Sequence, residues 1–113
     1  MCELREYKKR TLMKATLCLP NQEPLLLAVE GLSLPDSATG LAQIPTNVPV
    51  LLGCAPGLVD VLACGPGYVA YSVFDGDGEM NLEAMAAVTR VSGARFDIED
   101  EDTILLGPVL IVE

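Results

Sequence analysis

Short segments in which apolar side chains recur at every second position follow one another along this chain. Residues 14–19 alternate apolar and polar side chains and end at Pro20, and residues 25–30 form a second apolar segment beyond a polar turn. A period of two residues is typical of a β-strand with one buried face. The two segments therefore predict a β-hairpin.

The middle of the chain repeats one pattern at a spacing of ten residues. Pro-Gly dipeptides stand at 56–57 and 66–67, each beginning two residues after a cysteine, Cys54 or Cys64, and each followed by apolar residues. Proline presets the first central angle of a type II turn, and glycine supplies the positive φ of the second. The spacing is typical of an antiparallel meander with the two cysteines at matching strand ends. We expect free thiols there.

Residues 81–91 change to a helical pattern. Asn81 suits the N-cap, Glu83 lies where the helix dipole favours an anion, and Arg90 suits the last turn. Gly93 is placed to end the helix. The apolar side chains expected on one face are those of Leu82, Met85 and Ala86. A strand over residues 87–91 is the competing interpretation, and the capping residues favour the helix.

Beyond the helix, residues 95–98 predict a strand, residues 99–102 an acidic turn and residues 103–112 a last strand that bends at Gly107. Residues 41–46 are ambiguous. Six to eight short strands and at most one helix together predict a mostly β fold. The expected architecture is a small antiparallel β-sandwich or barrel with one short helix at about residues 81–91.

Charge divides the chain into a basic arm and an acidic body. Residues 1–13 are predicted to form the arm and residues 14–113 a single compact β-domain, since 113 residues leave room for one core. The formal charge is +3 over residues 1–14 and −12 over the rest. The basic residues expected to bind a partner are Arg5, Lys8, Lys9, Arg10 and Lys14.

The acidic body also limits the kinds of partner. It repels phosphates and anionic lipid headgroups, so we expect neither nucleic acid nor membrane binding. The acidic turn near residues 97–102 is a natural contact for the basic arm of a neighbouring copy. No apolar run approaches the roughly 18 residues of a membrane-spanning helix, and the first residues do not form a signal peptide. Synthesis and retention in the cytoplasm are the expectation.

Candidate chemistry is sparse. The chain has no histidine, which excludes serine–histidine and cysteine–histidine nucleophile pairs and imidazole metal ligands. Asp75, Asp77 and Asn81 partly match the spacing of a calcium-binding loop, but the match lacks the first ligand and the bidentate twelfth ligand. These three residues are weak metal candidates beside the plainer interpretation of a turn. We predict no catalytic residues and no cofactor.

The remaining signal is an excess of apolar surface. Half of the residues are apolar and 20% are charged, and from residue 15 to residue 89 there is no lysine or arginine. Strands without lysine leave their edges unprotected, so we expect the edges to be closed in a barrel, covered, or paired with another chain. The sequence therefore predicts a non-enzymatic assembly protein that forms oligomers, with a trimer favoured, and that docks on a larger protein shell.

In size, β-content and acidity the chain resembles the small decoration, or cement, proteins that stud phage capsids, which would place it on a virion surface. An acidic inhibitor or immunity-type protein that covers a basic site on its partner is the alternative. A small metal-dependent enzyme or ligand-binding barrel is the third, and the lack of histidine and the five aromatic residues count against it.

Overall fold

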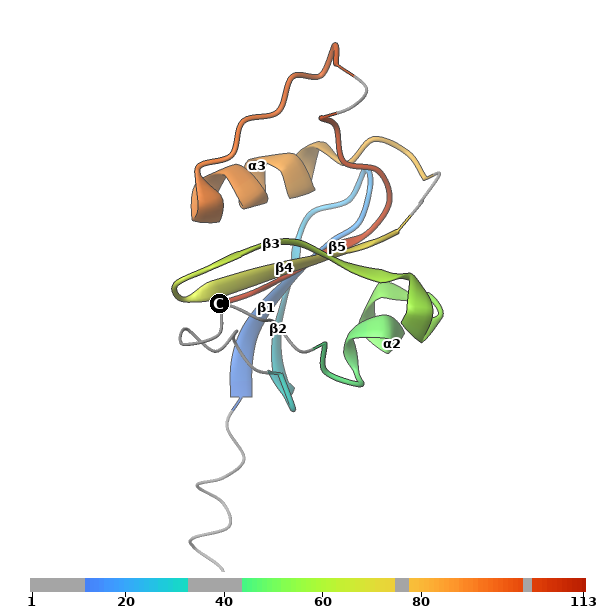
Figure 1. Cartoon of the computed structure of the whole chain (residues 1–113), viewed down its shortest axis with the longest axis vertical. Coiled ribbons are helices and arrows are strands. Elements are labelled where there is room, and N and C mark those ends of the chain that lie inside the picture. The colour runs from blue at the N-terminus through green and yellow to red at the C-terminus, as the bar shows by residue number, and fades with distance from the viewer. Residues whose placement is uncertain (1–11, 33–43, 75–77, 101–102) are drawn as a thin grey trace, which may run out of the picture.

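The computed structural model describes residues 12–32, 44–74, 78–100 and 103–113 (Figure 1). Five antiparallel strands form one sheet in the order β2-β1-β5-β4-β3. The strands are β1 (Leu12–Cys18), β2 (Leu25–Glu30), β3 (Val59–Gly65), β4 (Tyr68–Val73) and β5 (Val109–Val112). The mostly β prediction is therefore confirmed. The sheet is not closed, and neither the sandwich nor the barrel form is confirmed.

The last strand, β5, joins two hairpins. β1 and β2 pair directly, as do β3 and β4, and β5 lies between β1 and β4. All four side chains of β5 are 0% exposed. Those of Val109 and Ile111 face one core cluster, and those of Leu110 and Val112 face another on the opposite side. A strand covered on both faces needs apolar residues at every position, which the Val-Leu-Ile-Val sequence provides.

A helix covers each face of the sheet (Figure 1). α3 (Leu82–Ser92) packs over β3 and β5, and its buried residues are Ala84, Met85 and Val88. The helix predicted over residues 81–91 is confirmed. α2 (Val48–Leu52) lies on the other face and was not predicted. Pro49 lies in the first turn of this helix, where proline is tolerated because its missing N–H would have no partner within the helix.

The two Pro-Gly units form different structures. In the second, Gly65 pairs with Tyr68 across a two-residue turn, and Gly67 has a φ of 85°, as the predicted type II turn requires. In the first, Pro56–Leu58 forms a single 3₁₀ turn, η1, that leads into β3. Cys54 follows α2 and does not stand at a strand end, so its predicted equivalence with Cys64 was wrong.

The segment after α3 also differs from the prediction. Residues 95–98 form no strand and instead run back along α3, because Phe96 packs against the cluster beneath that helix. The last strand is shorter than predicted: it begins at Val109, and Leu106 makes only an isolated bridge to Met80. Gly107, with a φ of 73°, bends the chain between them as expected. At the other end, β1 begins at Leu12, two residues before the expected boundary at residue 14.

Candidate functional site

The predicted site residues fall mostly outside the described part of the chain. Arg5, Lys8, Lys9 and Arg10 of the arm lie there, as do Asp75 and Asp77 of the candidate metal loop. Lys14 is described: it is exposed on β1, where it pairs with Ala28 of β2. The structure therefore brings none of these charged residues together in the described ranges.

Asn81, the third metal candidate, is 0% exposed and holds three segments together. Its Nδ2 donates to the carbonyl oxygens of Cys18 at 2.9 Å and Gly107 at 2.7 Å, and its Oδ1 accepts from the backbone N–H of Ala84 at 3.0 Å. The last bond is the predicted N-cap of α3. Both polar atoms of this side chain are thus engaged with the backbone of the protein itself.

Within the described ranges, no three acidic or cysteine side chains come together in a way that could hold a metal ion. The described cysteines are free thiols, as predicted. Cys18 is buried, and burial is the main cause that raises the pKa of its thiol, with the nearby carboxylate of Glu83 adding to the effect. Cys54 is half-buried and Cys64 is exposed.

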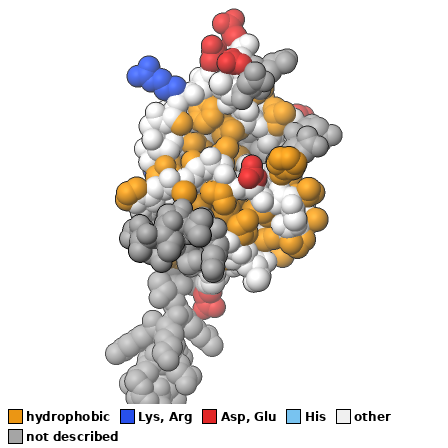
Figure 2. All heavy atoms as spheres, in the orientation of Figure 1, with side chains coloured by type: hydrophobic (Ala, Val, Ile, Leu, Met, Phe, Trp, Pro, Cys, Tyr) orange, Lys and Arg blue, Asp and Glu red, His pale blue; other side chains and the backbone are white. Residues whose placement is uncertain are grey.

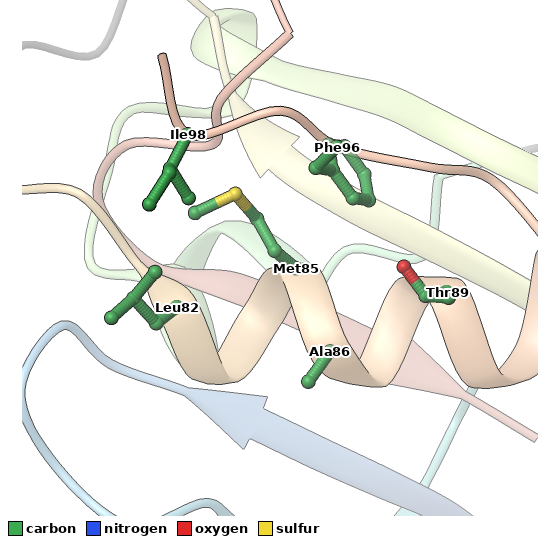
Figure 3. A pocket seen from close by; sticks show the side chains of 6 residues that line it. All are labelled: Leu82, Met85, Ala86, Thr89, Phe96 and Ile98. Atoms are coloured by element: carbon green, nitrogen blue, oxygen red, sulfur yellow. The ribbon is translucent and has the colours of Figure 1, made fainter.

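A shallow apolar groove lies along the outer side of α3 (Figure 3). Leu82, Met85, Ala86 and Thr89 line it from the helix, and Phe96 and Ile98 line it from the segment that runs back beside the helix. This is the helix face that the sequence predicted to be apolar. Of these three side chains Met85 is buried and Leu82 is 56% exposed, and the other buried residues of the helix are Ala84 and Val88.

The segment that borders this groove ends in an acidic loop. Asp97, Glu99 and Asp100 are exposed there, and acidic side chains stand out at the same end of the molecule in Figure 2. Thr103 closes the loop: its Oγ1 accepts from the N–H of Asp97 at 3.2 Å and contacts the carbonyl oxygens of Asp97 and Asp100. A groove with an apolar lining beside exposed carboxylates can bind a chain segment that has apolar side chains for the groove and basic side chains for the acidic loop.

A second apolar feature lies at the sheet edge formed by β2. Leu26 is 80% exposed, on the same face of the sheet as α3, beside the buried Thr16 of β1. Val50, on the outer side of α2, is 79% exposed. Sequence reasoning placed residues 25–30 in a strand but did not identify which leucine would be exposed, because three leucines in a row do not show which side is buried.

In the described ranges, every helix is too short or too polar to cross a lipid bilayer. Comparison of the chain with protein-family models, with curated proteins and with solved structures found no match.

Proposed function

We propose that this protein is a non-enzymatic structural protein that assembles with copies of itself and docks on a larger protein shell, in the manner of a capsid decoration protein. The observation that supports this proposal is the exposure of large apolar side chains on several sides of the molecule. Leu26 is 80% exposed, Val50 is 79% exposed, and Phe74 and Ile98 are each 62% exposed. Figure 2 shows apolar side chains spread over one face among few charged ones.

Isolated apolar side chains are normal on protein surfaces, but here little charge accompanies them. Between residues 15 and 89 the chain has no lysine or arginine to surround such side chains. Contact with another protein removes apolar surface from water at a gain of roughly 25 cal/mol per Å². Burial between subunits or against a shell therefore accounts for a surface of this kind.

The basic arm supplies the second part of the proposal. Arg5, Lys8, Lys9 and Arg10, with Lys14 beside them, carry positive charge, whereas the remainder of the chain has a net charge of −12. The arm of one copy and the acidic loop at Asp97, Glu99 and Asp100 of another are complementary in charge. We favour an assembly in which three copies cluster on a shell. Contacts between the arm of one copy and the acidic loop of the next would hold the three copies together.

The mass of the protein in solution tests the assembly proposal. Mass photometry and analytical ultracentrifugation at micromolar concentration should show oligomers that dissociate on dilution. A chain that stays strictly monomeric at these concentrations, and that does not associate with any shell, contradicts the proposal.

Deletion of residues 1–11 tests the role of the arm, because it spares β1, which begins at Leu12. We expect the shortened protein to keep its melting temperature but to associate less tightly, with weaker dependence on salt, since screening acts on the charge pairs that the deletion removes. Loss of folding on deletion would show instead that the arm is part of the core.

A specific observation supports a second function. The exposed acids Asp97, Glu99 and Asp100 gather in one loop, as expected if the protein covered a basic site on an enzyme as an inhibitor or immunity-type protein. Pull-down of a basic nuclease by a monomeric or dimeric protein, lost when these three acids are changed to asparagine or glutamine, would favour this function over assembly.

A further inference from the structure

We propose that the outer edge of β2, which none of the described strands pairs with, pairs antiparallel with β2 of a second copy, so that the two sheets become one continuous sheet across a two-fold axis. This inference rests on the proposed assembly function and adds a two-fold contact between copies to the contacts of the basic arm. The proposal rests on the direction of the backbone groups along β2, on a bond between the described residues that already occupies the carbonyl group of Glu30, and on the side chains that the pairing would bring together.

Backbone directions follow from one hydrogen bond in the neighbouring strand. The N–H of Glu113 donates to the carbonyl oxygen of Lys14 at 2.9 Å, so the peptide groups of Lys14 point toward β5. In a strand these directions alternate, and the peptide groups of Ala15 therefore point toward β2, where this residue pairs with Leu27. The backbone N–H and C=O groups of Leu27 therefore point toward β1. Those of its neighbours Leu26 and Ala28 point away from β1, to the outer edge of the sheet.

Glu30 has the same outward direction, but its carbonyl oxygen is already bonded. Nδ2 of Asn47, the residue just before α2, donates to it at 2.8 Å. The part of the edge that can still accept and donate hydrogen bonds therefore centres on Leu26 and Ala28.

One register of a β2–β2 pair fits these groups. In this register Leu26 lies opposite the partner's Ala28, and the two-fold axis passes beside Leu27. The outward N–H and C=O groups of Leu26 and Ala28 in one strand then form hydrogen bonds with those of the partner strand. Directly opposite residues share a sheet face. Leu26 would then be covered by the partner's Ala28, and Leu27 would lie opposite the partner's Leu27, with no charged residue facing another.

A shift of this register by two residues fits less well. Centring the pair on Ala28 would place Leu26 opposite the partner's Glu30 and would require the carbonyl group that Asn47 already occupies. The bonded Glu30 and the exposed Leu26 therefore favour the same register. Because that register is self-complementary, a second copy of this chain is the partner that fits the edge.

The opposite edge of the sheet is less suited to pairing. β3 has a bulge between Val61 and Ala63, which interrupts the regular spacing of its backbone groups, and its Asp60 is exposed. Residues 25–29 of β2 contain neither charge nor proline, the usual devices that keep sheet edges apart. A single strand pair buries less than the roughly 1,200 Å² of a standard interface, so we expect dissociation in the micromolar range.

The first test introduces a charge at the edge. We expect Leu26→Lys to weaken self-association at least tenfold in sedimentation equilibrium, because the ammonium group would lose water when the strands pair. Val50→Lys is the matched control: this side chain is 79% exposed against 80% for Leu26, but it lies on α2 away from the edge. Circular dichroism should show both variants folded.

The second test checks the register. Two directly opposite residues whose peptide groups point inward lie about 4.5 Å apart between Cα atoms, which is within disulfide range. In a background with Cys2, Cys54 and Cys64 changed to serine, mild oxidation should cross-link Leu27→Cys into a dimer on a non-reducing gel. Val29→Cys, which would face the partner's Leu25, should remain uncross-linked.

These outcomes separate the two proposals. An oligomeric wild-type protein whose association is unchanged by Leu26→Lys would overturn the β2 pairing while leaving assembly through another surface intact. Equal cross-linking of Leu27→Cys and Val29→Cys, or none in a folded oligomer, would also overturn it. A monomeric wild-type protein would contradict both.

Discussion

The amide of Asn81 shows how one side chain can determine the position of a whole helix. It accepts the N-cap bond of α3 and donates to the carbonyl oxygens of Cys18, the last residue of β1, and of Gly107, which lies two residues before β5. Because Asn81 is fully buried, removal of its amide would take one hydrogen bond from each of these two carbonyl oxygens and would leave the N–H of Ala84 without its cap, at a site that water does not reach.

We expect Asn81→Ala to lower the free energy of unfolding by about 2–4 kcal/mol, from the lost cap and the two lost hydrogen bonds to carbonyl oxygens. Asn47→Ala is the control, because Asn47 donates a single described bond and does not cap its helix. Its cost should stay below about 1.5 kcal/mol in the same urea titration. Equal losses for the two variants would contradict the role given to Asn81.

Two buried groups make stability depend on alkaline pH. Burial raises the pKa of the Tyr71 hydroxyl above its ordinary value of 10.0, and the nearby Cys64 thiol adds to this; burial likewise raises the pKa of Cys18 above 9.0. The unfolded chain therefore loses these protons at lower pH than the folded chain. Their contribution to the free energy of unfolding is constant below about pH 9 and decreases as pH rises further.

Urea titrations at several pH values above 8 should reveal this decrease. Tyr71→Phe and Cys18→Ala should each make the free energy of unfolding fall less steeply with pH, whatever they do to its value at neutral pH. The variant that carries both substitutions should show the weakest dependence on pH. If its free energy of unfolding falls with pH as steeply as that of the wild type, other groups cause the decrease.

At the scale of the element, α3 has a clear signal at each end. Its last turn closes at Gly93, which has a φ of 77° and donates its N–H to the carbonyl oxygen of Thr89 at 2.9 Å. A Cβ atom at this position would meet nothing within 4 Å. The constraint on Gly93 is therefore the left-handed backbone conformation itself and not the space around it.

Gly93→Ala should accordingly cost about 1 kcal/mol of stability through backbone strain alone. Gly57→Ala provides the comparison, since a Cβ there also meets nothing within 4 Å but Gly57 has no positive φ. We expect that variant to change stability by less than about 0.5 kcal/mol. Denaturant midpoints measured side by side isolate the cost of the positive φ, because neither position is crowded, and a similar loss at both glycines would contradict this account.

At the scale of the whole molecule, the two hairpins depend on the last four strand residues. β5 pairs with β1 on one side and β4 on the other, so the sheet is continuous only when the end of the chain has been inserted. Leu110 contributes to the core under α2, and its side chain is fully buried. Each face of β5 thus belongs to a different core cluster.

Truncation of Leu110 to alanine should destabilise the protein by about 2–5 kcal/mol, as is usual for a buried leucine. Leu58→Ala is the matched control, because Leu58 is 42% exposed, and it should cost less than about 1 kcal/mol. Removal of residues 108–113 should abolish cooperative unfolding altogether. A truncated chain that still melts in one sharp transition would show that the hairpins do not need β5.

Local features of the fold were predictable from the residues. The hairpin over residues 14–30, the turn at Pro66 and Gly67 and the limits of α3 were all predicted correctly. Each depends on interactions within a few residues: a cap, a positive φ or a two-residue alternation. Residues 95–98 were predicted wrongly, since an alternating apolar pattern also arises when Phe96 packs beside a helix and Ile98 borders the same groove.

By itself, the sequence determined the hairpin over residues 14–30, the turn at Pro66 and Gly67 and the limits of α3, together with the high apolar content and the separation of charge between arm and body. Tertiary structure alone decided that β5 lies between β1 and β4, that α3 covers only part of its face, and that Leu26 consequently remains exposed. The physical reason is range. Propensity and capping act between neighbours along the chain. Burial depends on which distant segments pack together, and the same apolar pattern is compatible with many packing arrangements.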